Sequence, residues 1–243
     1  MDRTAYDIEW RVGKTHWWFS GRRRLLKSLL SSIPLRKDAP ALDIGCGVGS
    51  HLGLLSSMGL RVLGVDSAIY CLAYAKQNVP GVGLVNGNLL DLPFKRNSMG
   101  FILAMDVLEH LDQDLQGIKE IYSTLIQDGI AVFTVPAFRF LWGVQDVVTG
   151  HRRRYTRAEM SNRLKQGGFT ILASSYFNFF LFLPILIARR LIRLAGVRVE
   201  SENEINSPLI NSVLKAIFSL EPPILRYLSF PFGVSIFFIV KKA

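Results

Sequence analysis

Residues 41–143 alternate between short apolar runs and amphipathic stretches, and this alternation limits the possible folds more than any other feature of the chain. Strands of a parallel sheet are apolar along their whole length, because helices cover both faces of the sheet. Amphipathic stretches between such strands are typical of crossover helices. The pattern predicts an α/β fold with strands at 41–45, 61–66, 82–87, 101–107 and 130–136.

Helices are expected between these strands, at 49–58, 68–78 and 111–126. Gly129 is expected to close the last of them, because glycine often follows the end of a helix. A further helix is predicted to begin at Thr156, which has the spacing of a capping box with Glu159. Gly167 and Gly168 should end it.

The part of the chain after residue 168 is harder to interpret, since residues 169–188 carry no charge over about the length of a membrane span. A crossing helix would leave residues 233–242, which have the pattern of a strand, on the far side of the membrane. We therefore expect a sixth strand at 169–177 and an inserted helical section after it.

The resulting prediction is an α/β fold with a Rossmann-like, mostly parallel seven-stranded sheet and helices on both faces. An apolar helical insertion precedes the last strand. One domain should span 1–243, divided into an amino-terminal helical cover at 1–36, a cofactor-binding core at 37–177, an apolar insertion at 178–230 and the last strand at 231–243.

A glycine-rich turn follows the first expected strand and opens a helix. Glycine permits the backbone angles of a tight turn and lets a ligand lie against the main chain. Asp66 ends the second strand, where nucleotide-binding α/β proteins place an acid for the ribose hydroxyls. Gly45, Gly47 and Gly49 follow Asp43 with a spacing that differs from that of dinucleotide sites. A nucleoside ligand is expected, and a dinucleotide site or a turn without a ligand are the alternatives.

Four segments of the chain, within residues 40–143, resemble the motifs of class I S-adenosylmethionine-dependent methyltransferases in their usual order. They are ALDIGCGVGS, GVD, GNLLDLPF and FILAMDVLEHLDQD. HRRRYT and HWWFSGRRR also resemble segments of a bacterial subgroup that has a membrane-associating insertion. The resemblance implies a methyltransferase that uses S-adenosyl-L-methionine.

The resemblance also implies roles for individual residues. The glycine-rich turn would contact the methionine part of the cofactor, and Asp66 would bind its ribose. Asn88 stands where the family often has Asp, so the amide keeps an acceptor beside the adenine and loses the charge. The full implied set is Asp43, Gly45, Cys46, Gly47, Gly49, Asp66, Ser67, Asn88, Leu89, Asp106 and Val107.

Methyl transfer requires an acceptor atom placed behind the methyl group, and an acceptor that carries a proton needs a base. His110 and His151 follow the fourth and fifth strands, so both are expected at the cleft, beside Asp106. Asp146 and Tyr155 are weaker candidates. For His110 the alternative is a structural role, and for His151 a solvated loop.

Three arginines precede Tyr155 near the expected acceptor pocket. Guanidinium groups suit phosphate and carboxylate, so Arg152, Arg153, Arg154 and Tyr155 are the candidate substrate-binding residues. The alternative is an exposed basic loop. Trp17, Trp18 and Phe19 are expected to pack inward on a helix that covers the cofactor.

The 178–230 insertion combines many apolar residues with cations, among them Arg189, Arg190, Arg193, Arg198, Lys215 and Arg226. Such a segment is typical of helices that lie in the interface of a membrane. A helical cap, a dimer interface and a true membrane span are the alternatives.

We therefore expect methyl transfer to a small-molecule or lipid-like acceptor at the cytoplasmic face of the cell membrane. A nucleic-acid methyltransferase is the alternative favoured by the net charge of +10, although the DVLEH segment differs from the Asn/Asp-Pro-Pro motifs used for exocyclic amines. A non-catalytic membrane scaffold is a third possibility.

The two cysteines, Cys46 and Cys71, predict neither a disulfide framework nor a metal site, and residues 1–19 contain no apolar stretch of signal-peptide length. A cytoplasmic protein is therefore expected, no residue is predicted to bind a metal ion, and metal dependence is left open. The oligomeric state is left open.

Overall fold

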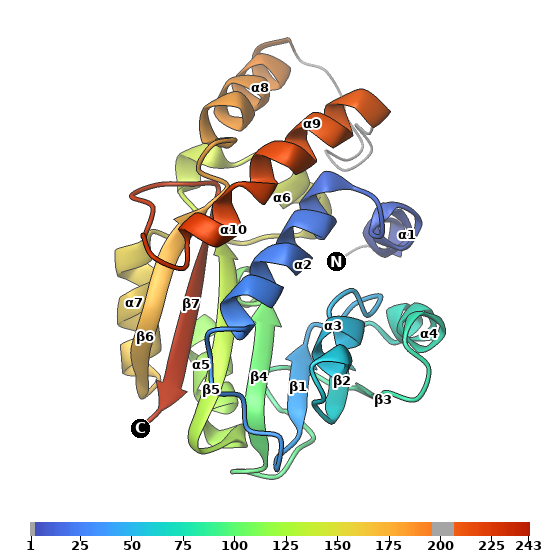
Figure 1. The fold of residues 1–243 in the computed structure, drawn as a ribbon, viewed down its shortest axis with the longest axis vertical. Helices are drawn as coiled ribbons and strands as arrows, with labels where there is room; N and C mark the ends of the chain where they lie inside the picture. The colour runs from blue at the N-terminus through green and yellow to red at the C-terminus, as the bar shows by residue number, and fades with distance from the viewer. Residues whose placement is uncertain (1–2, 196–206) are drawn as a thin grey trace.

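The computed structural model describes residues 3–195 and 207–243, which are built around one seven-stranded sheet (Figure 1). The strand order is β3-β2-β1-β4-β5-β7-β6, and β7 runs antiparallel to both of its neighbours. The prediction of a mostly parallel seven-stranded sheet is confirmed. The strands are β1 (Ala41–Ile44), β2 (Val62–Asp66), β3 (Gly83–Asn86), β4 (Met99–Met105), β5 (Leu125–Pro136), β6 (Phe169–Phe177) and β7 (Ser235–Lys242).

Helices cover both faces of the sheet, with α3 and α4 on one face and α5 and α7 on the other (Figure 1). The amino-terminal helices α1 and α2 and the later helices α8 and α9 lie toward the carboxyl ends of the parallel strands. The α-helices are α1 (Arg3–Val12), α2 (Trp17–Leu30), α3 (Leu52–Ser57), α4 (Ile69–Asn78), α5 (Asp114–Thr124), α6 (Val144–Thr149), α7 (Arg157–Gln166), α8 (Phe182–Ala195), α9 (Pro208–Ser219) and α10 (Glu221–Ile224); η1 (Leu108–His110) and η2 (Arg139–Leu141) are 3-10 turns.

The core follows from the apolar runs of the sequence. Every residue of β1 and β4 is buried, because these strands lie at the centre of the sheet with helices on both sides. The edge strand β3 is only partly buried. The aromatic rings that fill the sheet's two faces are fully buried and include Phe101, Phe133 and Phe238.

The prediction that Gly129 closes a helix is wrong. The helix α5 ends at Thr124, and β5 begins at the next residue. Asp128 has a φ of 63°, and the register between β4 and β5 shifts at this point, so the chain bends within the strand. By contrast, α7 begins with the expected capping box, in which Thr156 Oγ1 accepts a hydrogen bond from the Glu159 N–H.

The helix α9 packs directly on α2. The buried ring of Phe218 lies 6.2 Å from the ring of Trp17 and 6.3 Å from the ring of Trp18, measured between centroids. Gly21 lies beneath Phe218, where a Cβ atom would come within 2.1 Å of the phenylalanine ring. Asn211 Oδ1 accepts a hydrogen bond of 2.6 Å from the Trp17 N–H. One side of the insertion is therefore a cap on the amino-terminal cover.

The outer side of the insertion leaves large apolar side chains exposed. Arg189 donates to the Leu141 carbonyl and fixes α8 above η2. Within the described residues, no helix is long and apolar enough to cross a membrane. Arg198 and the rest of 196–206 lie outside the described residues. The exposed apolar residues of α8 and α9 are Leu183, Ile187, Leu191, Leu194, Leu209, Ile210 and Val213.

The contact between α2 and α9 can be tested at Gly21. We expect Gly21→Ala to lower the free energy of unfolding by about 1–3 kcal/mol, because the added methyl group overpacks the Phe218 site. Gly53→Ala is the matched control, since its Cβ would meet only Val79 at 3.7 Å and should raise stability by up to about 1 kcal/mol. Urea unfolding measures both. Equal stability of the two variants would contradict the docked position of α9.

Candidate functional site

A cavity of about 440 Å³ opens at the carboxyl ends of the central strands. β1 lies between β2 and β4, so the chain changes direction across the sheet at this point, where α/β proteins commonly bind ligands. α1 and α2 form one wall, and α8 and α9 contribute another. The structure brings most of the predicted site residues to this cavity: Gly45, Cys46, Gly47, Asp66, Ser67, Asn88, Leu89, Asp106, Val107, His110, His151 and Arg154.

The glycine-rich turn has the geometry that only glycine tolerates. Gly45 has a φ of 66°, and a Cβ atom there would lie 2.6 Å from Val107 Cγ2. The Gly47 N–H donates a hydrogen bond of 2.9 Å to Asp66 Oδ2, and the Ala68 N–H donates one of 2.9 Å to Oδ1. Asp66 therefore fixes the turn against the end of β2.

Two residues of α1 close this end of the cavity, and no pattern in the sequence revealed them. The Tyr6 hydroxyl donates a 3.4 Å hydrogen bond to Asp66 Oδ1, and burial beside that carboxylate raises the pKa of Tyr6 far above its usual value. Glu9 Oε1 accepts a 2.6 Å hydrogen bond from the Ser50 hydroxyl. Tyr6 and Glu9 thus line the wall of the cavity beside Asp66.

Two predicted cofactor residues, Asp43 and Gly49, lie behind the cavity wall. Asp43 is buried in β1, and its Oδ2 has no hydrogen-bond partner within the described chain. Burial raises the pKa of this carboxyl well above its usual range. Gly49, with a φ of 84°, allows the turn to approach Ala75 on α4. Their positions favour a role in shaping the turn.

Asp106, at the end of β4, has a left-handed backbone conformation with a φ of 55°. Such strain in a residue other than glycine often marks a functional site. Its carboxylate forms a 2.7 Å ion pair with Arg22 and accepts a 3.0 Å hydrogen bond from the Thr134 hydroxyl. Arg22 lies over the ring of Trp18, one helical turn earlier in α2. The i, i+4 spacing of Trp18 and Arg22 is the sequence feature from which the inward position of Arg22 could have been predicted.

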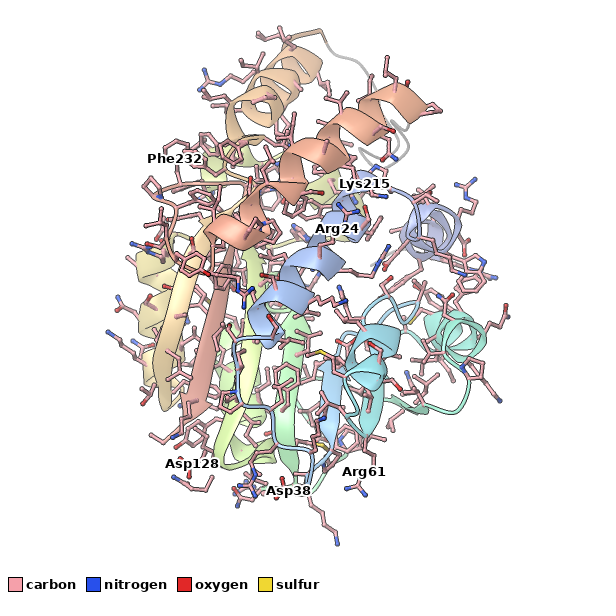
Figure 2. The ribbon with its side chains drawn as sticks, in the orientation of Figure 1. Arg24, Asp38, Arg61, Asp128, Lys215 and Phe232 are labelled. Atoms are coloured by element: carbon pink, nitrogen blue, oxygen red, sulfur yellow. The ribbon has the colours of Figure 1, made fainter. Side chains whose placement is uncertain are left out.

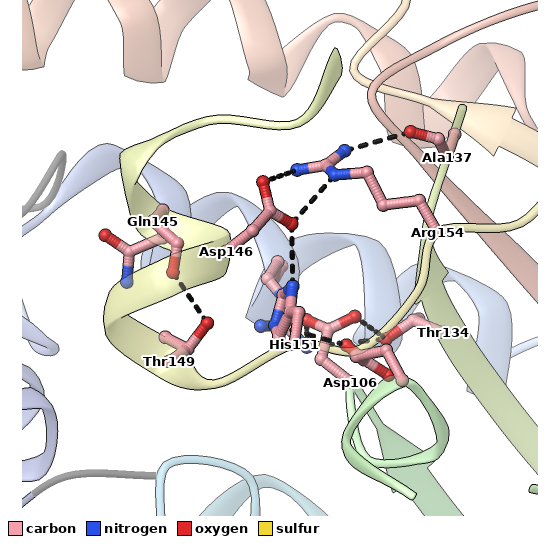
Figure 3. Close-up of polar contacts among 10 residues, drawn as sticks. Asp106, Thr134, Ala137, Gln145, Asp146, Thr149, His151 and Arg154 are labelled. Carbon is pink, nitrogen blue, oxygen red and sulfur yellow. Dashed lines mark hydrogen bonds and ion pairs between the residues drawn. The ribbon is translucent and has the colours of Figure 1, made fainter. Parts of the chain in front are cut away.

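His151 is held by Asp146, as Figure 3 shows. Asp146 Oδ1 lies 2.8 Å from His151 Nδ1, and Arg154 binds both oxygens of the same carboxylate at 2.8 and 2.9 Å. Although burial alone would raise it, the hydrogen bonds from His151 and Arg154 hold the pKa of Asp146 far below its usual value. With Nδ1 engaged by Asp146, Nε2 of His151 is the nitrogen left to accept a proton or bind a metal ion.

Glu109 and His110 lie beside His151. Glu109 is fully buried, and within the described residues neither of its carboxylate oxygens has a hydrogen-bond partner. Burial, with the nearby charge of Asp106, raises the pKa of Glu109 well above its usual range. Burial, with the neighbouring His151, lowers the pKa of His110 to about 4, so its ring is neutral at neutral pH. Both histidines were predicted site residues, whereas Glu109 was not, although it adjoins His110 in DVLEH.

Carboxylates of the protein engage all four residues predicted to bind substrate: Arg152, Arg153, Arg154 and Tyr155. Arg152 lies 2.5 Å from Asp112, and Arg153 lies 3.3 Å from Asp114. The Tyr155 hydroxyl donates to Asp114 at 3.0 Å. Among the four, Arg154 alone lines the cavity. The segment is thus tied down by ion pairs, and the prediction that these arginines orient an anionic substrate gains no support from their positions.

Comparison with known proteins agrees with this geometry. Residues 42–133 match the family model of a methyltransferase domain. A protein of Mycolicibacterium smegmatis named "Probable S-adenosylmethionine-dependent methyltransferase" is 26% identical over 162 residues, which cover 66% of this chain and 62% of the relative. A demethylmenaquinone methyltransferase of Staphylococcus epidermidis is 26% identical over 130 residues, covering 49% of this chain and 54% of the relative. The chain thus spans about three fifths of the length of the first of these relatives.

Solved structures show the same fold. A SAM-dependent methyltransferase from Archaeoglobus fulgidus superposes with a TM-score of 0.57 at 19% identity, covering 90% of this chain and 94% of that one. Phosphoethanolamine N-methyltransferase 2 of Haemonchus contortus, in complex with S-adenosyl-L-methionine, has a TM-score of 0.58 at 20% identity and covers 90% of this chain and 52% of that one. The fold is that of class I methyltransferases. The chain contains an S-adenosylmethionine-dependent methyltransferase domain.

The cavity suits this cofactor on its own chemistry. The turn at Gly45 and Gly47 leaves no room for side chains and presents main chain to a ligand. Asp66 provides carboxylate oxygens at the position where a ribose diol would bond. Asn88 and Leu89 lie at the same wall, where the adenine is expected.

The role of Asp66 can be measured by calorimetric titration with S-adenosylhomocysteine. We expect Asp66→Ala to weaken binding at least about tenfold, or about 1.4 kcal/mol, because the ribose contact and the support of the turn are both lost. Asp38→Ala is the control, since Asp38 is an exposed carboxylate paired with Arg36 and lies outside the cavity. Unchanged affinity in Asp66→Ala would contradict the ribose assignment.

Proposed function

We propose that the chain transfers a methyl group from S-adenosylmethionine to a lipophilic acceptor at the inner face of the cell membrane. The observation that carries the proposal is the composition of the cavity wall. One end consists of the glycine-rich turn and Asp66, and the other is apolar. The apolar end is formed by Ile185, Ala188 and Ile192 of α8 with Ile210 and Leu214 of α9, and Arg189 of α8 also lines the cavity there.

The two ends of the cavity suggest how the acceptor is oriented. An apolar chain placed between α8 and α9 would direct its polar end toward the strand ends, where Asp106, His110 and His151 lie. Bound S-adenosylmethionine supplies a methyl group on a sulfonium, which is displaced in line by the acceptor atom. Trp17, Trp18 and the rest of the α1–α2 cover shield this point from water.

The outer surface of the same helices supports contact with a membrane. Leu194 on α8 is 84% exposed and Leu209 on α9 is 75% exposed. Cations lie on these elements as well: Arg190 on α8, Lys215 on α9, and Arg24 on the adjacent helix α2. Figure 2 shows Lys215, Arg24 and Phe232 in the half of the molecule that carries α8 and α9. Apolar side chains among cations suit an anionic lipid surface.

The methyl transfer can be tested with a cofactor labelled in its methyl group and a lipid extract of bacterial membranes. We expect label to enter the organic phase with release of S-adenosylhomocysteine, and the rate to fall sharply in Asp66→Ala. Demethylmenaquinone, the molecule in the name of the Staphylococcus epidermidis relative, is the first pure acceptor to add. Label that appears in RNA and not in lipid would contradict the proposal.

Membrane contact can be tested by co-sedimentation with vesicles of phosphatidylglycerol. We expect the double variant Leu191→Asp/Leu209→Asp to bind at least about tenfold more weakly, because two charges then replace side chains that enter the acyl region. Ile69→Asp is the matched control, since Ile69 is 69% exposed on α4, far from the insertion in sequence. Equal binding of the two variants would contradict an α8–α9 membrane surface.

A further inference from the structure

Glu109, His110 and His151 bring three metal-ligand side chains together at the wall of the cavity, which the two histidines line. One ligand atom from each lies within 4.8 Å of the other two. His151 Nε2 is 3.7 Å from Glu109 Oε1, and the two imidazole rings are nearly perpendicular with centroids 4.8 Å apart. Two histidines and one carboxylate are a common ligand set for divalent transition metals.

The state of Glu109 points to a missing partner. It is completely buried, yet in the described part of the chain neither carboxylate oxygen receives a hydrogen bond. A buried carboxylate is costly unless a hydrogen bond, a cation or a metal ion compensates it. The two arginines whose charges act on Glu109 each form an ion pair with another carboxylate, Arg22 with Asp106 and Arg154 with Asp146.

The surroundings of His151 are those of a metal ligand. Metal-binding histidines usually donate their second ring N–H to a carboxylate, which fixes the ring and directs the other nitrogen at the ion. Asp146 fills this role at 2.8 Å from Nδ1, and Arg154 and the Gly143 N–H hold Asp146 in turn. The arrangement leaves Nε2 on the side of Glu109.

We propose that Glu109, His110 and His151 bind one divalent transition-metal ion, with Zn²⁺ as the best match to the ligand set, and that the ion binds the acceptor oxygen during methyl transfer. Two ligands in a tetrahedral arrangement about 2.1 Å from one ion are about 3.4 Å apart, so small side-chain rotations close the site. The protein supplies three ligands, and two of them, His110 and His151, line the cavity. The sequence alone predicted no metal-binding residue and left metal dependence open.

The ion would activate an acceptor hydroxyl. An oxygen bound to a divalent cation loses its proton to water more readily. The oxygen then attacks the methyl carbon, the new C–O bond forms as the C–S bond of the sulfonium breaks, and S-adenosylhomocysteine leaves uncharged. In this scheme His151 holds the ion and is not the proton acceptor. The catalytic role rests on the proposed methyl transfer, whereas the binding of the ion does not.

Metal binding is tested directly on the full chain after removal of metal with a chelator. Equilibrium dialysis against Zn²⁺ should give one ion per chain, and Co²⁺ should produce the visible absorption of a site with nitrogen and oxygen ligands. Glu109→Gln, His110→Ala and His151→Ala should each lower the affinity by more than about 100-fold, and Asp146→Asn by about 10- to 100-fold. Mg²⁺, which prefers oxygen ligands, should bind more weakly.

His51→Ala is the matched control, because His51 is another of the four histidines and lies at the cavity but outside the cluster. It should keep one tight Zn²⁺ site. Titration with S-adenosylhomocysteine and circular dichroism show that each variant is folded. The absence of tight binding, or binding that survives in His110→Ala and His151→Ala, would overturn the proposal. Tight binding without methyl transfer to any lipid would leave the metal site standing and contradict the proposed function instead.

Discussion

The ion pair between Arg22 and Asp106 joins the parts of the molecule on which the site depends. Arg22 belongs to the amino-terminal cover, and Asp106 ends the central strand β4 in a left-handed conformation. Thr134, on the neighbouring strand β5, binds the same carboxylate. Because both charges are largely buried, loss of either partner would leave an uncompensated charge inside the protein, which is strongly destabilising. The cover is therefore fixed to the sheet at the wall of the cavity, which both residues line.

The sheet and the cofactor end of the cavity could be predicted from the sequence because their signals are local. Apolar runs define the strands, and the close approach of Val107 explains why Gly45 must be glycine. The start of β5 was misplaced, since the bend at Asp128 lies inside the strand and its residues resemble a turn. Tyr6 reaches Asp66 across sixty residues, and no local pattern encodes such a contact.

The acceptor end shows the limit of arguments from residue type. Three consecutive arginines suggest a site for an anion, but a sequence does not tell which carboxylates of the protein will reach them first. Asp112, Asp114 and Asp146 do so here. Conversely, Glu109 attracts little notice beside a histidine in sequence, and only its burial without hydrogen bonds makes it a strong candidate for chemistry.

The packing of Phe218 on Gly21 has a consequence for the order in which the protein is assembled. The strands and turn that would hold the cofactor come from the first half of the chain, whereas the roof of the cavity combines helices from both ends of it. During synthesis on the ribosome, the cofactor half can form while α2 still exposes the groove that α9 will fill. The cavity gains the wall formed by α8 and α9 only after these helices have been made, so a methyl donor could be bound before the apolar end of the cavity exists.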